Sequence, residues 1–96
     1  MMMNREQTVE TFKRKLDEWN SEMDTLEKKA EKFEDERRKE AKQTLDELQK
    51  QWDDAKGTLQ ELKSASDDAF DDVRSGTQKA WDAMSQSIDR AMQRYN

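Results

Sequence analysis

Residues 12–33 read FKRKLDEWNSEMDTLEKKAEKF, and this stretch decides the fold. Its apolar residues follow one another in alternating steps of four and three, with almost only polar residues between them. They are Phe12, Leu16, Trp19, Met23, Leu26, Ala30 and Phe33. This spacing places them in a narrow stripe along one side of a helix, which is the pattern of a coiled-coil seam. Because a stripe is one half of an interface, this helix needs a partner helix.

The composition indicates paired helices. The chain has 96 residues, of which 43% are charged and 31% apolar, with no proline and two glycines. So little apolar surface does not fill a globular core, but it suits helices that each bury one stripe. Disorder is the competing interpretation of such polarity, and the periodic placement of large apolar residues argues against it. We therefore expect one all-α domain over residues 1–96.

Charge and residue usage exclude several classes of function. The formal net charge is −5, whereas binding to nucleic acid or to anionic lipid needs a basic face. The sequence has no cysteine and no histidine, so thiolate sites and the commonest general base and metal ligand are missing. We expect no enzyme, no cofactor and no metal. No apolar stretch has the length of a signal peptide or a membrane span, so we expect a cytoplasmic protein.

The sequence predicts a long first helix from about residue 5 to about residue 63. Asn4 or Thr8 can cap its start, and no residue before Lys63 is obliged to end it. Residues 34–44 (EDERRKEAKQT) contain no large apolar side chain, and their composition favours a solvated continuation of the helix. The alternative is a turn in this segment, with Thr44 and Glu47 as the capping box of a new helix.

Two further stripes follow the charged segment. The second is one residue late relative to the first, a phase shift that changes a supercoil locally. It contains Leu45, Leu48, Trp52, Ala55, Leu59, Leu62, Ser66, Ala69 and Val73. The third contains Phe70, Val73, Thr77, Trp81, Met84, Ile88, Met92 and Tyr95. The best candidate for a break between them is 63–68, because its serines and aspartates suit the start of a new helix. A shorter helix is expected from about 67 to 95.

Two architectures fit these helices. In the first, the long helix (about 5–63) and the shorter one (about 67–95) form a coiled coil, as a hairpin or as one extended helix. The second is a three-helix bundle, which the even spacing of Trp19, Trp52 and Trp81 along the chain indicates. In the hairpin the shorter helix covers only the middle third of the chain, and the Phe12–Phe33 stretch then lacks a partner within its own chain.

We expect the first two stripes to form the contact with another molecule. A second copy of the chain is the favoured partner, in a dimer or a higher helical bundle, and a different protein is the alternative. The predicted interface residues are Phe12, Leu16, Trp19, Met23, Leu26, Ala30, Phe33, Leu45, Leu48, Trp52, Leu59 and Leu62.

Two other features favour simple structural interpretations. Asp67, Asp68, Asp71 and Asp72 form the densest acidic patch, but no calcium-loop pattern surrounds them, and a solvated helix start explains them. The third stripe has the spacing of an amphipathic helix. Aspartates instead of lysines and arginines mark its polar side, which argues against a membrane surface.

Three segments carry a resemblance to a known group of proteins. They are Lys15–Asn20 (KLDEWN), Leu59–Ser66 (LQELKSAS) and Lys79–Asp82 (KAWD). In this order, around a charged middle, they resemble small uncharacterised bacterial coiled-coil proteins of about this length. Gly76 also matches, whereas residues 69–73 (AFDDV) replace an element that contains tryptophan in that group. The resemblance implies a bacterial, soluble, helical and self-associating protein, and it carries no established activity.

Three functions therefore remain open. The favoured one is a non-catalytic structural or interaction protein that self-associates through its helical seams. The alternatives are a regulatory helical subunit that docks on a larger complex, and a stress-related or lipid-surface amphipathic helix protein.

Overall fold

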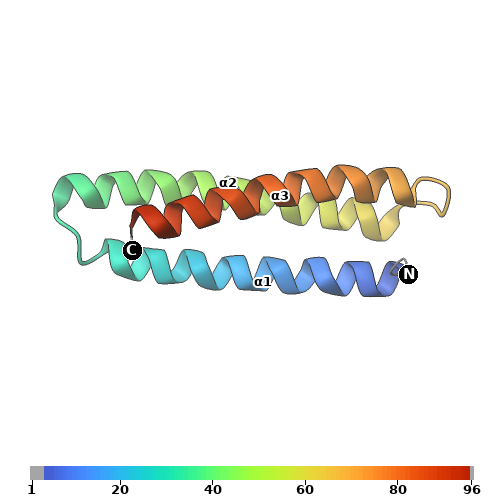
Figure 1. Cartoon of the computed structure of the whole chain (residues 1–96), viewed down its shortest axis with the longest axis horizontal. Helices are drawn as coiled ribbons and strands as arrows, with labels where there is room; N and C mark the ends of the chain where they lie inside the picture. Colours follow the sequence, from blue (N-terminus) through green and yellow to red (C-terminus); the bar gives the residue numbers. More distant parts are fainter. Residues whose placement is uncertain (1–3, 96) are drawn as a thin grey trace.

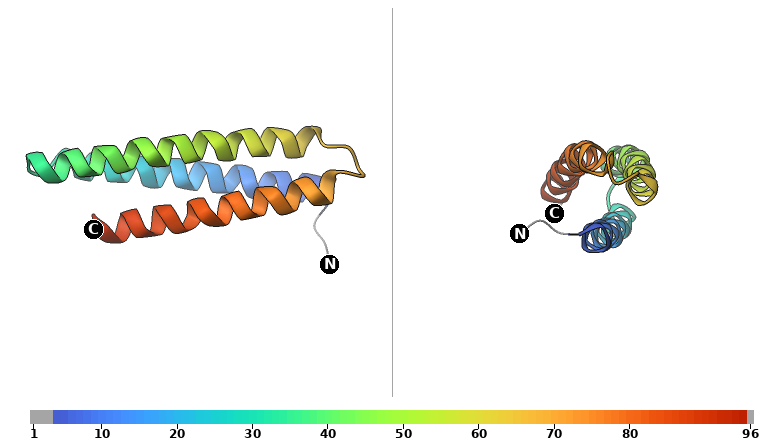
Figure 2. Two further views of the ribbon diagram at one scale, coloured as in Figure 1. Left: turned by 90° about the horizontal axis from the view of Figure 1, so that it is seen from above. Right: turned by 90° about the vertical axis from the view of Figure 1, so that its right-hand side faces the viewer.

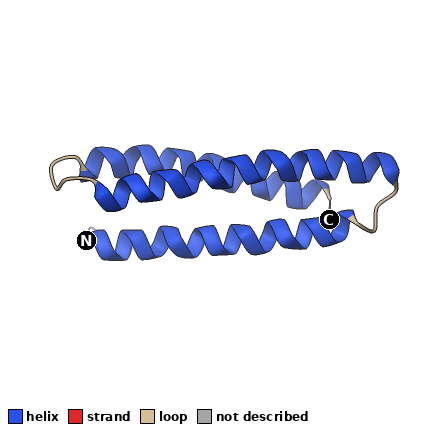
Figure 3. Cartoon of the chain, turned by 180° about the vertical axis from the view of Figure 1, so that it is seen from behind, coloured by secondary structure: helices blue, strands red, loops and turns tan. Residues whose placement is uncertain are grey.

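The computed structural model describes residues 4–95, which form three helices joined by two short turns (Figure 1). The helices are α1 (Arg5–Ala30), α2 (Asp35–Ser64) and α3 (Phe70–Arg94). Each runs antiparallel to the one before it, and the described residues outside the helices lie in turns and helix caps (Figure 3). The bundle is elongated, with extents of 51 × 19 × 16 Å. The view along its axis shows three helices around a common centre (Figure 2). The all-α prediction is confirmed, and of the two architectures the three-helix bundle is the one that forms.

Asn4 begins α1 as the sequence predicts. The backbone N–H of Gln7 donates to the Asn4 side chain at 2.8 Å. The backbone N–H of Asn4 in turn donates to the Gln7 side chain at 3.4 Å. These two bonds form a capping box, which satisfies donors that the first turn of a helix otherwise leaves free.

The continuous helix expected for residues 5–63 is wrong, because the chain turns at 31–34. Glu31 keeps helical angles (φ −61°, ψ −24°), and the next two residues still bond to carbonyls three positions back. Glu34 leaves the helix through its ψ of 164°, while its φ of −69° remains helical. Neither a glycine nor a positive φ is involved. No residue within this turn therefore predicts it from the sequence.

The alternative for residues 34–44, a turn followed by a helix with Thr44 and Glu47 as its capping box, is also wrong. Helix α2 already begins at Asp35, and Thr44 lies within it. The Thr44 hydroxyl instead lies 3.4 Å from the hydroxyl of Tyr95. It joins α2 to the end of α3.

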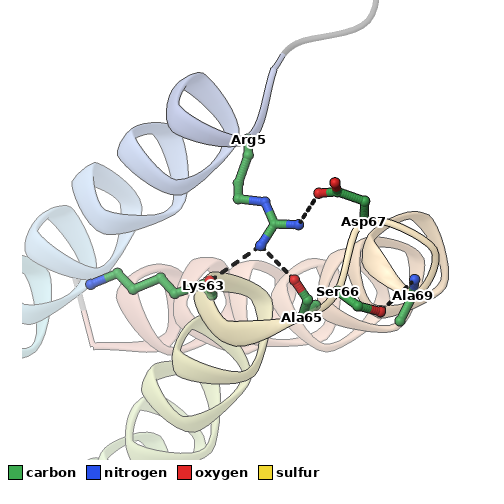
Figure 4. Close-up of polar contacts among 6 residues, drawn as sticks. All are labelled: Arg5, Lys63, Ala65, Ser66, Asp67 and Ala69. Atoms are coloured by element: carbon green, nitrogen blue, oxygen red, sulfur yellow. Dashed lines mark hydrogen bonds and ion pairs between the residues drawn. The ribbon is translucent and has the colours of Figure 1, made fainter.

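The second turn falls in the predicted region, between Ser64 and Phe70. Ala65 ends α2 with an extended ψ of 142°. Within the turn, the backbone N–H of Ala69 donates to the Ser66 hydroxyl at 3.3 Å, as Figure 4 shows. This bond stabilises the turn, but the expectation that a serine caps the next helix is wrong, because the N-cap of α3 is Ala69 and no side chain caps it.

Arg5 of α1 ties this turn to the rest of the bundle (Figure 4). Its guanidinium donates to the carbonyls of Lys63 at 3.2 Å and Ala65 at 2.6 Å. It also pairs with the Asp67 carboxylate at 3.2 Å and lies 4.7 Å from the centre of the Phe70 ring. The last carbonyls of a helix need partners outside it. Arg5 supplies them from the start of the chain.

The three stripes meet along the axis of the bundle and form its core. The buried apolar residues are Phe12, Leu16, Trp19, Met23, Leu26, Ala30, Ala41, Leu48, Ala55, Leu59, Leu62, Trp81, Met84, Ile88, Ala91 and Tyr95. Two threonines, Thr8 and Thr77, are buried with them and donate to carbonyls of their own helices at 3.0 and 2.8 Å. Each aliphatic side chain buried in this way stabilises the fold by about 1.5–3 kcal/mol.

Trp81 of α3 is buried in this core between the other two helices. Its ring centre lies 4.5 Å from that of Phe12 and 4.9 Å from that of Trp19, both on α1. Its indole N–H donates to the Thr58 hydroxyl of α2 at 3.1 Å. One side chain therefore contacts both other helices.

Candidate interaction surface

The structure places most of the predicted interface residues inside a single chain. Those that are buried are Phe12, Leu16, Trp19, Met23, Leu26, Ala30, Leu48, Leu59 and Leu62. The expectation that the Phe12–Phe33 stretch lacks a partner within its own chain is therefore wrong, because α2 and α3 cover its stripe. The three remaining residues, Phe33, Leu45 and Trp52, are half-buried. They indicate where apolar surface still reaches the outside.

Phe33 is already covered at the end of the bundle. Its ring centre lies 6.0 Å from that of Tyr95, and the Arg37 guanidinium lies 4.7 Å from its ring centre. Arg37 also donates to the carbonyl of Arg94 at 3.3 Å. This cluster closes the bundle next to the 31–34 turn.

Trp52 is placed differently, in the groove between α1 and α2. Its indole N–H donates to the Leu16 carbonyl at 2.9 Å, which fixes the ring against α1. The ammonium of Lys56 lies 5.6 Å from its ring centre, a distance that permits a cation–π contact. The ring is half-buried. Trp52 therefore combines a fixed position with a partly accessible aromatic surface.

An open groove of about 530 Å³ lies between α1 and α2, nearer the 31–34 turn than Trp52 is. Helix α1 lines it with Asn20, Ser21, Met23, Asp24, Glu27, Ala30 and Glu31, and α2 with Lys42, Leu45, Asp46 and Gln49. Four carboxylates thus face one lysine. The Asp24 carboxylate also forms an ion pair, at 3.4 Å, with the ammonium of Lys28, which does not line the groove. This end of the surface is acidic.

The opposite end carries both signs, because exposed Asp17 and Asp53 lie seven residues from Asp24 and Asp46, on the same sides of their helices, and beside two lysines. Trp52 of α2 lies beside Leu16 of α1, because its indole bonds to the Leu16 carbonyl. The two helices are antiparallel. Lys56, one turn after Trp52, therefore lies at the same level as Lys13, one turn before Leu16. Both lysines are exposed, and neither forms an ion pair within residues 4–95. Val9 lies seven residues before Leu16, on the same side of α1, and is half-buried.

We call this surface the α1–α2 outer face. It comprises Val9, Lys13, Asn20 and Asp24 of α1 and Leu45, Asp46, Gln49, Trp52 and Lys56 of α2. Of these residues, Trp52 is the one aromatic side chain.

The groove between α1 and α3 offers less apolar surface. It measures about 230 Å³ and lies over Phe12, Trp19 and Trp81, which are only 3–6% exposed. Farther along, partial burial and the nearby carboxylates of Asp89 and Glu18 raise the pKa of Glu22. Ionised Glu22 therefore slightly destabilises the bundle above that pKa, and its protonation at lower pH removes the penalty.

Among residues 4–95 no group of three or more acidic side chains is placed to hold a metal ion. Within the same residues, none of the helices combines the length and the apolarity that crossing a membrane requires. What the arrangement offers is a partly apolar surface among charged side chains.

Part of this surface could be predicted from the sequence. Leu45 and Trp52 were predicted interface residues, but their stripe gave no sign that they sit at its exposed edge. Val9, Lys13, Lys56, Asp24 and Asp46 were missed. The signal for Val9 was its seven-residue spacing from Leu16, and the charges needed the register of α1 against α2. Among known proteins, no family model, no curated protein and no solved structure matches this chain.

Proposed function

We propose that this is a non-catalytic structural or interaction protein that self-associates, and that the α1–α2 outer face is its contact surface. The observation that carries the proposal is Trp52, a large aromatic side chain that stays partly exposed on an otherwise charged surface. Half-buried Leu45 lies seven residues before Trp52, on the same side of α2. Tryptophan is enriched at protein interfaces and often dominates their binding energy.

The dimensions of the bundle support a stable contact. Interfaces of ordinary size bury about 800 Å² on each partner. The bundle is 51 Å long and 19 Å wide, so one face along its length provides an area of this order. Self-association through the Phe12–Phe33 stripe would instead require the bundle to open, because Leu26 and Leu62 are at most 1% exposed. The proposal therefore moves the contact from the stripe to its outer edge.

The kind of organism and the compartment that we propose rest on the sequence resemblance. That resemblance implies a bacterial protein, and the charged exterior of all three helices suits the cytoplasm. A larger complex that uses this protein as a regulatory subunit would dock on the same face. The experiment below separates the two roles, since it uses the purified chain alone.

We predict that Trp52→Glu weakens self-association by at least about 30-fold, as expected for an interface residue worth about 2 kcal/mol or more. Sedimentation equilibrium over a wide concentration range measures the effect, and circular dichroism checks that the variant stays helical. The matched control is Gln43→Glu, which makes a residue of α2 acidic that is exposed and lies outside the groove lining. It should associate like the unaltered chain.

Two results would contradict the proposal. If the unaltered chain remains a helical monomer at every concentration, self-association is wrong. If Trp52→Glu and the control associate equally well, the contact lies on another face.

A further inference from the structure

We infer that residues 65–76 open as a local unit while the rest of the bundle stays folded, and that Arg5 of α1 is the latch, the contact that has to break before they open. This segment comprises the second turn and the start of α3. It shares no residue with the α1–α2 outer face. The inference therefore goes beyond the proposed self-association and does not depend on it.

The segment supplies no fully buried side chain to the core. Leu62 and Thr77 are 0% and 2% exposed, whereas none of residues 63–76 between them is buried. Its larger apolar side chains, Phe70 and Val73, are half-buried. A helix in a protein owes most of its stability to the packing of its apolar side. The start of α3 is therefore held less firmly than the part after Thr77.

The first turn of α3 also lacks a side-chain cap. Its N-cap is Ala69, and no side-chain cap bond forms there, although Asp71 and Asp72 favour the positive end of the helix. Farther along, the Nε of Arg74 is buried without a hydrogen-bond partner within residues 4–95, while its Nη2 lies 3.9 Å from the Asp71 carboxylate. A buried donor without a partner lowers the stability of the closed state. Opening exposes this donor to water.

Gly76 weakens the same part of α3. It lies inside the helix, its φ is not positive, and a Cβ there would meet no neighbouring atom within 4 Å. No geometric need therefore explains the glycine, which lowers helix stability relative to alanine because more backbone freedom is lost on folding. Gly57 of α2 is equally open, but buried Ala55 and Leu59 hold the helix on both sides of it. Gly76 instead lies in a segment without buried side chains.

Arg5 holds this weak segment from α1. Its guanidinium donates to the carbonyls of Lys63 at 3.2 Å and Ala65 at 2.6 Å (Figure 4). It also lies 4.7 Å from the centre of the Phe70 ring. The pair with Asp67 adds little, because the Asp67 side chain is fully exposed. The end of α2 and the start of α3 therefore share one latch, and its release frees both.

The other end of the bundle is closed more firmly. There Tyr95 is 2% exposed, and Ala30 and Ala41 are 1% and 0% exposed. The Tyr95 ring lies against that of Phe33, with 6.0 Å between the ring centres. Several buried side chains have to separate before this end opens. The segment at residues 65–76 therefore opens first.

Amide hydrogen exchange of the full chain in dilute solution, followed residue by residue by NMR, tests the inference. In the unaltered chain the amides of residues 73–76 should exchange at least about tenfold faster than those around Trp81, after correction for intrinsic rates, because they open locally. Arg5→Gln should accelerate exchange at residues 73–76 by about tenfold, since it removes charge-assisted bonds that the open state lacks. Arg14→Gln, which removes the same charge at an exposed position of α1, should leave this exchange unchanged.

Two further variants separate local opening from unfolding of the whole bundle. Ile88→Val reduces packing in the core, where Ile88 is 2% exposed. It should accelerate exchange of the core amides several-fold without changing residues 73–76, because its contacts stay intact in the locally open state. Gly76→Ala should slow exchange at residues 73–76 by about fivefold. It acts in the opposite direction to Arg5→Gln and keeps the test decisive if that variant folds poorly.

Three results would overturn the inference. If residues 73–76 exchange as slowly as those around Trp81, or if Ile88→Val accelerates both equally, the segment opens only with the whole bundle. If Arg5→Gln leaves exchange at residues 73–76 unchanged, Arg5 is not the latch. None of these results bears on self-association, which sedimentation equilibrium tests separately.

Discussion

Replacing Leu26 by aspartate should unfold the whole bundle. Leu26 lies on α1 in the core and is 1% exposed. The substitution removes the burial of an aliphatic side chain, worth about 2 kcal/mol, and places a carboxylate without a partner among apolar groups. The two effects together cost several kcal/mol. A domain of this size is stable by only about 5–15 kcal/mol.

Circular dichroism and thermal melting measure this effect. We expect loss of helix from all three segments, since α1 supplies one side of the core against which both other helices pack. Glu27→Gln is the control. It alters the next residue, which is exposed, and should change the stability by less than about 0.5 kcal/mol. Equal effects of the two substitutions would mean that the register of α1 is different.

Truncating Trp81 to alanine should lower the free energy of unfolding by about 3–5 kcal/mol, as is usual for a buried aromatic residue. The substitution removes the ring contacts with Phe12 and Trp19 and the hydrogen bond to Thr58. Trp81→Phe keeps an aromatic ring but loses the N–H donor, so its cost should be nearer 1 kcal/mol. Urea unfolding, followed by circular dichroism, measures both.

Trp52→Ala provides the comparison for Trp81. Trp52 is half-buried and bonds only to a backbone carbonyl of α1, so its truncation should cost the monomer less than that of Trp81. The opposite order would show that α3 does not pack on α1 as described here.

Much of the fold could be predicted from apolar periodicity. The stripe from Phe12 to Ala30, the one from Leu48 to Leu62 and the one from Thr77 to Tyr95 all supply buried residues. They do so because a helix that buries one side needs apolar residues at that spacing. The break near residues 63–68 was also predictable, although no serine caps α3, and the acidic residues in its first turn are Asp71 and Asp72. The spacing of one tryptophan per arm indicated the three-helix alternative.

The turn at 31–34 could not be predicted in the same way. Its residues are ordinary helix formers. Glu31 keeps helical backbone angles, and the ψ angle of Glu34 departs far from helical values. The fold-back gains packing between α1 and α2 over their whole length. Such tertiary packing overrides local preference. No residue within the turn carries that information.

The candidate surface was predictable only in part, for a related reason. Periodicity marks Trp52 and Leu45 as apolar stripe residues, but it does not distinguish the centre of a stripe from its edge. Which charged residues of α1 lie beside which of α2 depends on the register of the two helices, and the bond between Trp52 and Leu16 sets that register. Only then can charged residues of the two helices be assigned to one face.

The central claim is that the stripe of α1 is closed within its own chain, and one distance tests it most directly. Asn20 and Gln49 are exposed and line the same groove from α1 and α2, and the chain has no cysteine. Spin labels on cysteines introduced at these two positions report the distance between the helices. Refolding with an excess of unlabelled chain restricts the signal to pairs within one molecule. We predict a distance below about 20 Å, since packed helices lie about 8–10 Å apart. A distance of about 44 Å, as in one continuous helix at 1.5 Å per residue, would contradict the account.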